Sequence, residues 1–92
     1  MDSIHPNDRR AALAFAIGAT ERQAPSVTRD LNLHTLKSLR DTPALDLCHP
    51  NDVIAALEFP LREAERPSGD PLRSLNLLVL RSLKDTAAKA VR

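Results

Sequence analysis

Residues 5–15 read HPNDRRAALAF, and residues 49–59 read HPNDVIAALEF. The chain repeats itself at this offset of 44 residues, and the ungapped alignment of residues 5–48 on residues 49–92 contains 20 identities in 44 positions. Coincidence in a chain rich in Leu and Ala does not explain the similarity, because His, Pro, Asn, Asp and Phe recur as well. Self-similarity at a fixed period is the signature of a repeated structural unit. We therefore interpret the chain as a tandem duplication.

Each HPND box is typical of a helix start. Proline suits the first helical position, where its missing N–H costs nothing, and a carboxylate in the first turn faces unpaired N–H groups and the positive end of the helix dipole. The boxes therefore place His5 and His49 at N-caps, with Asp8 and Asp52 beside the free N–H groups. In this interpretation all four residues are structural.

Each unit predicts two helices joined by a short loop. The first helices should run to about residue 23 and about residue 66, and Pro60 should kink the later one or split it after Glu58. The second helices should begin after Ser26 and, with Asp70 as N-cap, at Pro71, and they should end near residues 42 and 90.

These elements predict an all-α fold. We expect two helical hairpins, residues 5–48 and 49–92, that pack as a pseudo-twofold four-helix domain. The length of 92 residues suits one domain and is too short for two ordinary ones. We therefore treat residues 1–92 as a single helical domain.

Two asparagines lie at matching positions inside the Leu-rich faces of the second helices. They are Asn32 and Asn76. A buried amide without a partner costs about 1–3 kcal/mol, and a buried Asn can fix the register of packed helices. Our hypothesis is that both lie near the pseudo-twofold axis and bond each other or nearby backbone. The alternative is that each reaches the rim of its apolar face and bonds water.

Four apolar side chains are candidate anchors for a partner. They are Phe15, Phe59, Leu75 and Leu78. At about 100° per residue, each Phe points away from the apolar face of its own helix. Either a broad core covers the two rings, or they anchor a homodimer seam or a partner groove. A charged rim would orient the partner and raise the association rate; its members are Arg22, Arg62, Glu65 and Arg66.

The second unit is the more apolar copy. Leu78 replaces His34, Val79 replaces Thr35, and Val53 and Ile54 replace Arg9 and Arg10. Two equivalent units in a simple monomer should need similar burial. The excess therefore predicts that the second unit packs against something more, such as a second chain.

The reactive residues lack the pattern of a catalytic or metal site. No His pair at i, i+4 and no pair of closely spaced Cys is present, although a specific zinc site requires one. Cys48 and His49 are adjacent, and neighbours on an extended segment point apart. The chain also has no Gly-rich phosphate loop and no GxSxG or HExxH motif. We expect no enzymatic activity, no metal and no cofactor.

The composition limits both the kinds of partner and the cellular location that we expect. Thirteen Lys and Arg against twelve Asp and Glu leave a net charge of +1, and aromatic residues make up 2% of the chain, which favours neither phosphate backbones nor base stacking. The single Cys fits a reducing compartment. No segment reaches the roughly 18 apolar residues of a membrane span, and the N-terminus does not read as a secretory signal. We expect a cytoplasmic protein of bacterial or phage origin with no membrane partner.

DNA binding is the alternative function. The segment from Ala14 through Gly18 to the polar helix start at Ser26 is a degenerate helix-turn-helix pattern. Six cations near it could contact phosphates: Arg9, Arg10, Arg22, Arg29, Lys37 and Arg40. However, the spacing from Gly18 to Val27 is too long for the compact motif. The preferred function is therefore a small non-catalytic adaptor, inhibitor or regulatory subunit that binds another protein, or a second copy as a homodimer, through apolar helix faces.

Overall fold

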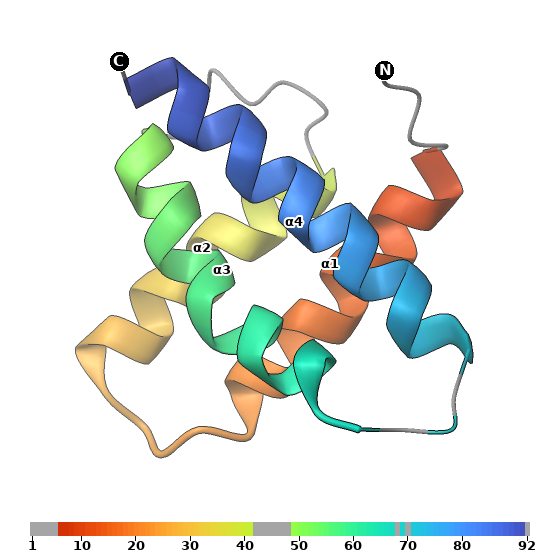
Figure 1. Ribbon diagram of the computed structural model, residues 1–92. Helices are drawn as coiled ribbons and strands as arrows, with labels where there is room; N and C mark the ends of the chain where they lie inside the picture. Colours follow the sequence, from red (N-terminus) through yellow and green to blue (C-terminus); the bar gives the residue numbers. More distant parts are fainter. Residues whose placement is uncertain (1–5, 42–48, 68, 70, 92) are drawn as a thin grey trace.

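In the computed structural model, which describes residues 6–41, 49–67, 69 and 71–91, the chain forms four helices and, over these residues, no strand. The helices are α1 (Pro6–Glu21), α2 (Val27–Asp41), α3 (Pro50–Glu65) and α4 (Pro71–Val91) (Figure 1). Ala, Leu, Arg, Lys and Glu dominate these segments, and all five have high helix propensity. The predicted all-α, four-helix architecture is confirmed.

Side-chain caps fix two of the helix starts. The Ser26 Oγ accepts the Arg29 N–H at 3.0 Å at the start of α2. At the start of α3, the Nδ1 of His49 accepts the Asn51 N–H at 3.1 Å, and the residue that follows His49 is a proline, as the HPND box predicts. His5, the predicted cap of α1, lies outside the described residues.

The first helix of each unit ends slightly earlier than expected. α1 stops at Glu21 rather than near residue 23, because the Arg22 N–H bonds the Ala19 carbonyl at 3.2 Å, three residues back. α3 stops at Glu65 rather than near residue 66, because Arg66 adopts extended backbone angles, φ −63° and ψ 141°. The residue after Arg66 is a proline, which disfavours the helical conformation of the residue before it.

Pro60 does not split α3, so that alternative is wrong. The helix continues from Pro50 to Glu65, and the Pro60 ring is buried among the core side chains of this helix. Proline cannot donate to the carbonyl four residues earlier, which costs about 3 kcal/mol inside a helix. Burial of the ring against the other helices offsets part of that cost, and Ala16, the matching residue of α1, is buried too.

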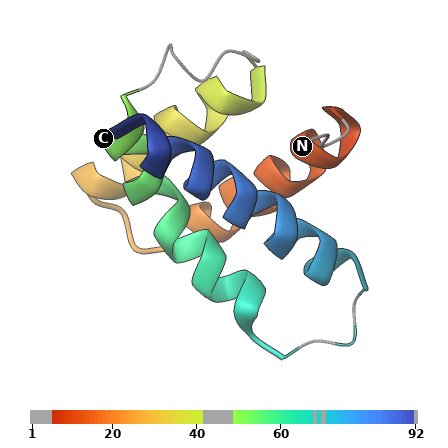
Figure 2. The same cartoon turned by 45° about the horizontal axis from the view of Figure 1, so that its top comes forward.

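α1 and α3 form the centre of the domain. Each packs against all three other helices, whereas α2 and α4 share at most marginal contact (Figures 1 and 2). The packing of α1 on α4 has its counterpart in the packing of α3 on α2. This pattern is compatible with a pseudo-twofold arrangement, while the duplication itself stays a prediction from the sequence.

The core is built largely from matching residues of the two units. Leu13 and Leu57 in the central helices are both 0% exposed, and so are Leu36 and Leu80 in the outer helices. Burying one leucine side chain contributes about 1.5–3 kcal/mol. The shared Leu pattern of the two units thus supplies a large part of the hydrophobic stabilisation.

Candidate functional site

Three leucines of α4 stay in contact with water. Leu72, Leu75 and Leu78 follow one another at three-residue spacing, and their exposed fractions are 64%, 37% and 65%. Residues three apart are neighbours on a helix surface, so the three form a continuous apolar row. We call this row the leucine strip. It lies beside the buried face of the same helix, which carries Val79 and Leu80.

The leucine strip contains the part of the second unit's apolar excess that the core does not absorb. Val53 and Val79 are buried, and Ile54 packs partly buried against the core. Leu78 and Leu72, which stand where the first unit has His34 and Thr28, remain exposed. The excess is therefore divided between the interior and one outer surface of α4.

The two phenylalanines are not free anchors. Both are only half-buried, and Phe15 packs against the core. The guanidinium carbon of Arg73 lies 5.5 Å from the centroid of the Phe15 ring, within the range of a cation–π contact. The structure therefore places Phe15 in the contact between α1 and α4. Phe59, at the matching position of α3, has a similar degree of exposure.

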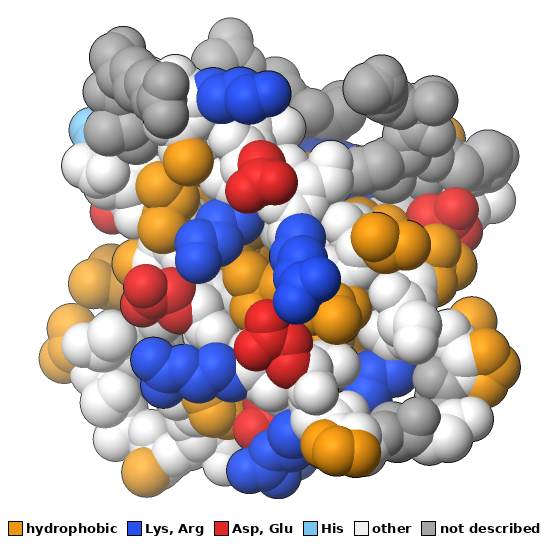
Figure 3. Space-filling model, in the orientation of Figure 1, with side chains coloured by type: hydrophobic (Ala, Val, Ile, Leu, Met, Phe, Trp, Pro, Cys, Tyr) orange, Lys and Arg blue, Asp and Glu red, His pale blue; other side chains and the backbone are white. Residues whose placement is uncertain are grey.

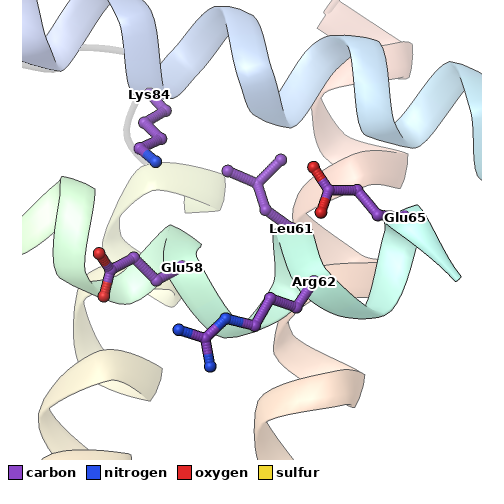
Figure 4. A pocket seen from close by; sticks show the side chains of 5 residues that line it. All are labelled: Glu58, Leu61, Arg62, Glu65 and Lys84. Carbon is purple, nitrogen blue, oxygen red and sulfur yellow. The ribbon is translucent and has the colours of Figure 1, made fainter.

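Two of the four predicted rim residues meet in a shallow pocket between α3 and α4. Arg62 and Glu65 line it together with Glu58, Leu61 and Lys84, around a volume of about 230 Å³ (Figure 4). Leu61 points toward α4, Lys84 reaches from α4 toward α3, and the two Glu stand on either side. Its two carboxylates and two cations balance one another, so the pocket favours neither a cation nor an anion.

The other rim residues lie at the ends of helices. The exposed Arg66 forms an ion pair with Glu63, with Nε 3.5 Å from Oε2. Arg22 is exposed just after α1, and its guanidinium lies beside Gly18. The structure thus gathers Arg62 and Glu65 beside α4, whereas Arg22 stays against its own helix.

An ion pair connects this rim to the helix of the leucine strip. Arg81 Nη2 lies 3.1 Å from Glu65 Oε2, and both side chains are about half exposed. Arg81 is three residues after Leu78, so the two are surface neighbours on α4. On the face in Figure 3, hydrophobic side chains alternate with charged groups of both signs.

The two asparagines do not pair with each other. Asn32 and Asn76 are both half-buried, and no hydrogen bond joins them among the described residues. Their helices, α2 and α4, share at most marginal contact, which keeps the amides apart. Asp8 and Asp52 occupy the first turns of α1 and α3, as predicted.

Sequence reasoning missed a pair of arginines that close the hairpins. Arg29 Nη1 donates to the carbonyls of Glu21 at 3.4 Å and Gln23 at 3.3 Å, at the end of α1. Arg73 Nη1 donates to the Glu63 carbonyl at 2.6 Å, at the end of α3. Cations satisfy unpaired carbonyls at helix C-termini. The signal was available, because the two arginines match in the repeat alignment.

The cations proposed for DNA contact are partly engaged within the fold. Arg29 caps α1, and the Nε of Arg40 lies 2.8 Å from the Oδ1 of Asp41. The hydrogen bond from Arg40 is the main cause that lowers the pKa of Asp41, and the same bond raises the pKa of Arg40. These two side chains already have partners of their own.

Membrane spans, metal clusters and relatives give this chain no functional assignment. Within the described part of the chain, no helix is long and apolar enough to cross a membrane, and no group of three or more His, Cys, Asp or Glu could hold a metal. Comparison of the chain with protein-family models, curated proteins and solved structures finds no significant match.

Proposed function

We propose that this chain is a small non-catalytic adaptor, inhibitor or regulatory subunit that docks on a protein partner through α4. The leucine strip carries the proposal. Single exposed leucines are normal on a protein surface, but this row places three of them side by side on one helix. Covering them removes apolar area from water, at about 25 cal/mol per Å².

The charges beside the strip suit a role in orientation. Arg81 of α4 pairs with Glu65 of α3, Arg62 lies on α3 near Glu65, and all three side chains remain in contact with solvent. Exposed charges at an interface rim mainly raise the association rate and select the orientation, and they add little affinity. The proposed setting is the cytoplasm, because a single cysteine is typical of a reducing compartment.

The test compares two leucines of nearly equal exposure. Leu78 in the strip is 65% exposed, and Leu31 on α2 is 62% exposed. We expect Leu78→Asp to abolish capture of the partner from the native host, with the helix content unchanged by circular dichroism. Leu31→Asp should retain capture. Equal behaviour of the two variants would show that α4 is not the docking helix.

A further inference from the structure

We infer that the partner of α4 is a second copy of this chain, packed antiparallel along the outer face of the helix. The inference rests on the proposed function, and it adds the identity and the register of the partner. It uses four residues of α4, which we call the outer seam: Leu78, Arg81, Asp85 and Ala88.

The outer seam is a single solvent-facing line. Its members are spaced by three, four and three residues, the spacing by which one helix lays a straight row against another. Leu78 is 65% exposed, the Arg81 side chain is 55% exposed, and Asp85 and Ala88 are exposed as well. No other helix of the described chain covers this line.

The outer seam is complementary to the outer seam of a second copy that runs in the opposite direction. A twofold axis midway between positions 81 and 85 sets Arg81 opposite Asp85 of the second copy, and the same pair forms again on the other side of the axis. The same register sets Leu78 opposite Ala88, a large side chain against a small one, which is how facing helices interdigitate. A twofold interface requires this self-complementarity. One register satisfies both charge and volume.

Arg81 and Asp85 are both available for ion pairs with the second copy. Asp85 forms no ion pair among the described residues. Arg81 is held by Glu65 at 3.1 Å, but a guanidinium has five N–H donors and can hold a second carboxylate. The ion pair with Glu65 fixes the arginine in place before the second copy arrives, which reduces the entropy lost on binding.

The matching line of α2 does not offer the same surface. His34 stands in place of Leu78, and Lys37 and Asp41 stand in place of Arg81 and Asp85. Asp41 is already paired with Arg40 at 2.8 Å. The two units therefore differ at the residues that the seam uses, and α2 serves as an internal control.

The seam covers only about half the length of α4. A single row of this length is small for a standard stable interface, which buries roughly 800 Å² per partner. We therefore expect a weak dimer whose population rises with protein concentration. Sedimentation equilibrium of the full chain measures this association directly.

Charge reversal tests the register. Arg81→Asp makes the centre of the seam acidic on both copies, and Asp85→Arg makes it basic, so each variant alone should dimerise at least about tenfold more weakly because like charges face each other. An equimolar mixture should form a heterodimer about as tightly as the unmodified chain, because every charge then meets its opposite. The control variants Lys37→Asp and Asp41→Lys should leave the dimer unchanged, and circular dichroism should show the same helix content throughout.

Two outcomes overturn the inference. One is an unmodified chain that stays monomeric at every concentration, and the other is a mixture of the two variants that associates no better than either alone. The proposed function survives both results if Leu78→Asp still abolishes partner capture and Leu31→Asp does not. It fails separately if capture is indifferent to Leu78.

Discussion

His49 determines where α3 begins. Its backbone is extended, with φ −65° and ψ 133°, and its Nδ1 accepts the Asn51 N–H, one of the N–H groups that the first turn leaves unpaired. The imidazole of His49 therefore acts as the acceptor of the cap.

Removal of this cap should destabilise the fold measurably. We expect His49→Ala to lower the free energy of unfolding by about 1 kcal/mol, the usual cost of losing an N-cap side chain. His34→Ala is the matched control, because His34 is an exposed residue within α2. Denaturant unfolding followed by circular dichroism measures both. An equal effect of the two substitutions would contradict the capping role of His49.

At the level of single residues, the sequence predicts local roles better than distant ones. The role of His49 follows from the four letters of its box, because a cap involves only the next few residues. The role of Arg73 depends on a carbonyl ten residues earlier and on the Phe15 ring of another helix. The position of Arg73 on a helical face does not identify either contact.

Pro60 lies within the regular helix α3. Its position in α1 is taken by Ala16, and both residues are buried. The proline removes one helical hydrogen bond, while its ring adds apolar volume to the core. The two matching positions therefore let the cost of the proline be measured in two directions.

We expect Pro60→Ala to stabilise the protein by about 1 kcal/mol. Restoring the helix is worth about 3 kcal/mol, and about 2 kcal/mol of this is lost because the ring atoms leave the core. Ala16→Pro should destabilise by about 3 kcal/mol or more, because α1 has no space prepared for a ring. Denaturant midpoints compare the two. A destabilising Pro60→Ala would mean that the packing of the ring outweighs the missing hydrogen bond.

The helices were predictable to within two residues, and the errors have a common origin. α1 and α3 both end in a bond to the carbonyl three residues back, and they close two residues and one residue sooner than the apolar pattern indicates. The prediction that Pro60 could split α3 failed for another reason. Propensity acts along one helix, whereas burial of the ring depends on the other helices that pack on it.

In the whole molecule, the two hairpins pack extensively against each other. α1 packs on α4 and α3 packs on α2, so the central helix of each hairpin contacts the outer helix of the other. The periodicity of the sequence identifies which face of each helix is apolar, but it does not state which helix covers that face. This explains why Val79 of the apolar excess proved buried and Leu78 proved exposed.

The packing of the two hairpins on each other predicts a single unfolding transition. Leu13 and Leu57 belong to different units, and both are 0% exposed in the central helices. Leu13→Val and Leu57→Val each remove one methylene from the core and should each cost about 1 kcal/mol. Because α1 and α3 touch both hairpins, either substitution should lower the melting temperature of the entire molecule. Scanning calorimetry should give a calorimetric enthalpy equal to the van't Hoff enthalpy for the unmodified chain and for both variants. Two transitions, with each substitution shifting only one of them, would mean that the units fold independently and that the contacts between α1, α3 and their neighbours across the hairpins contribute little to stability.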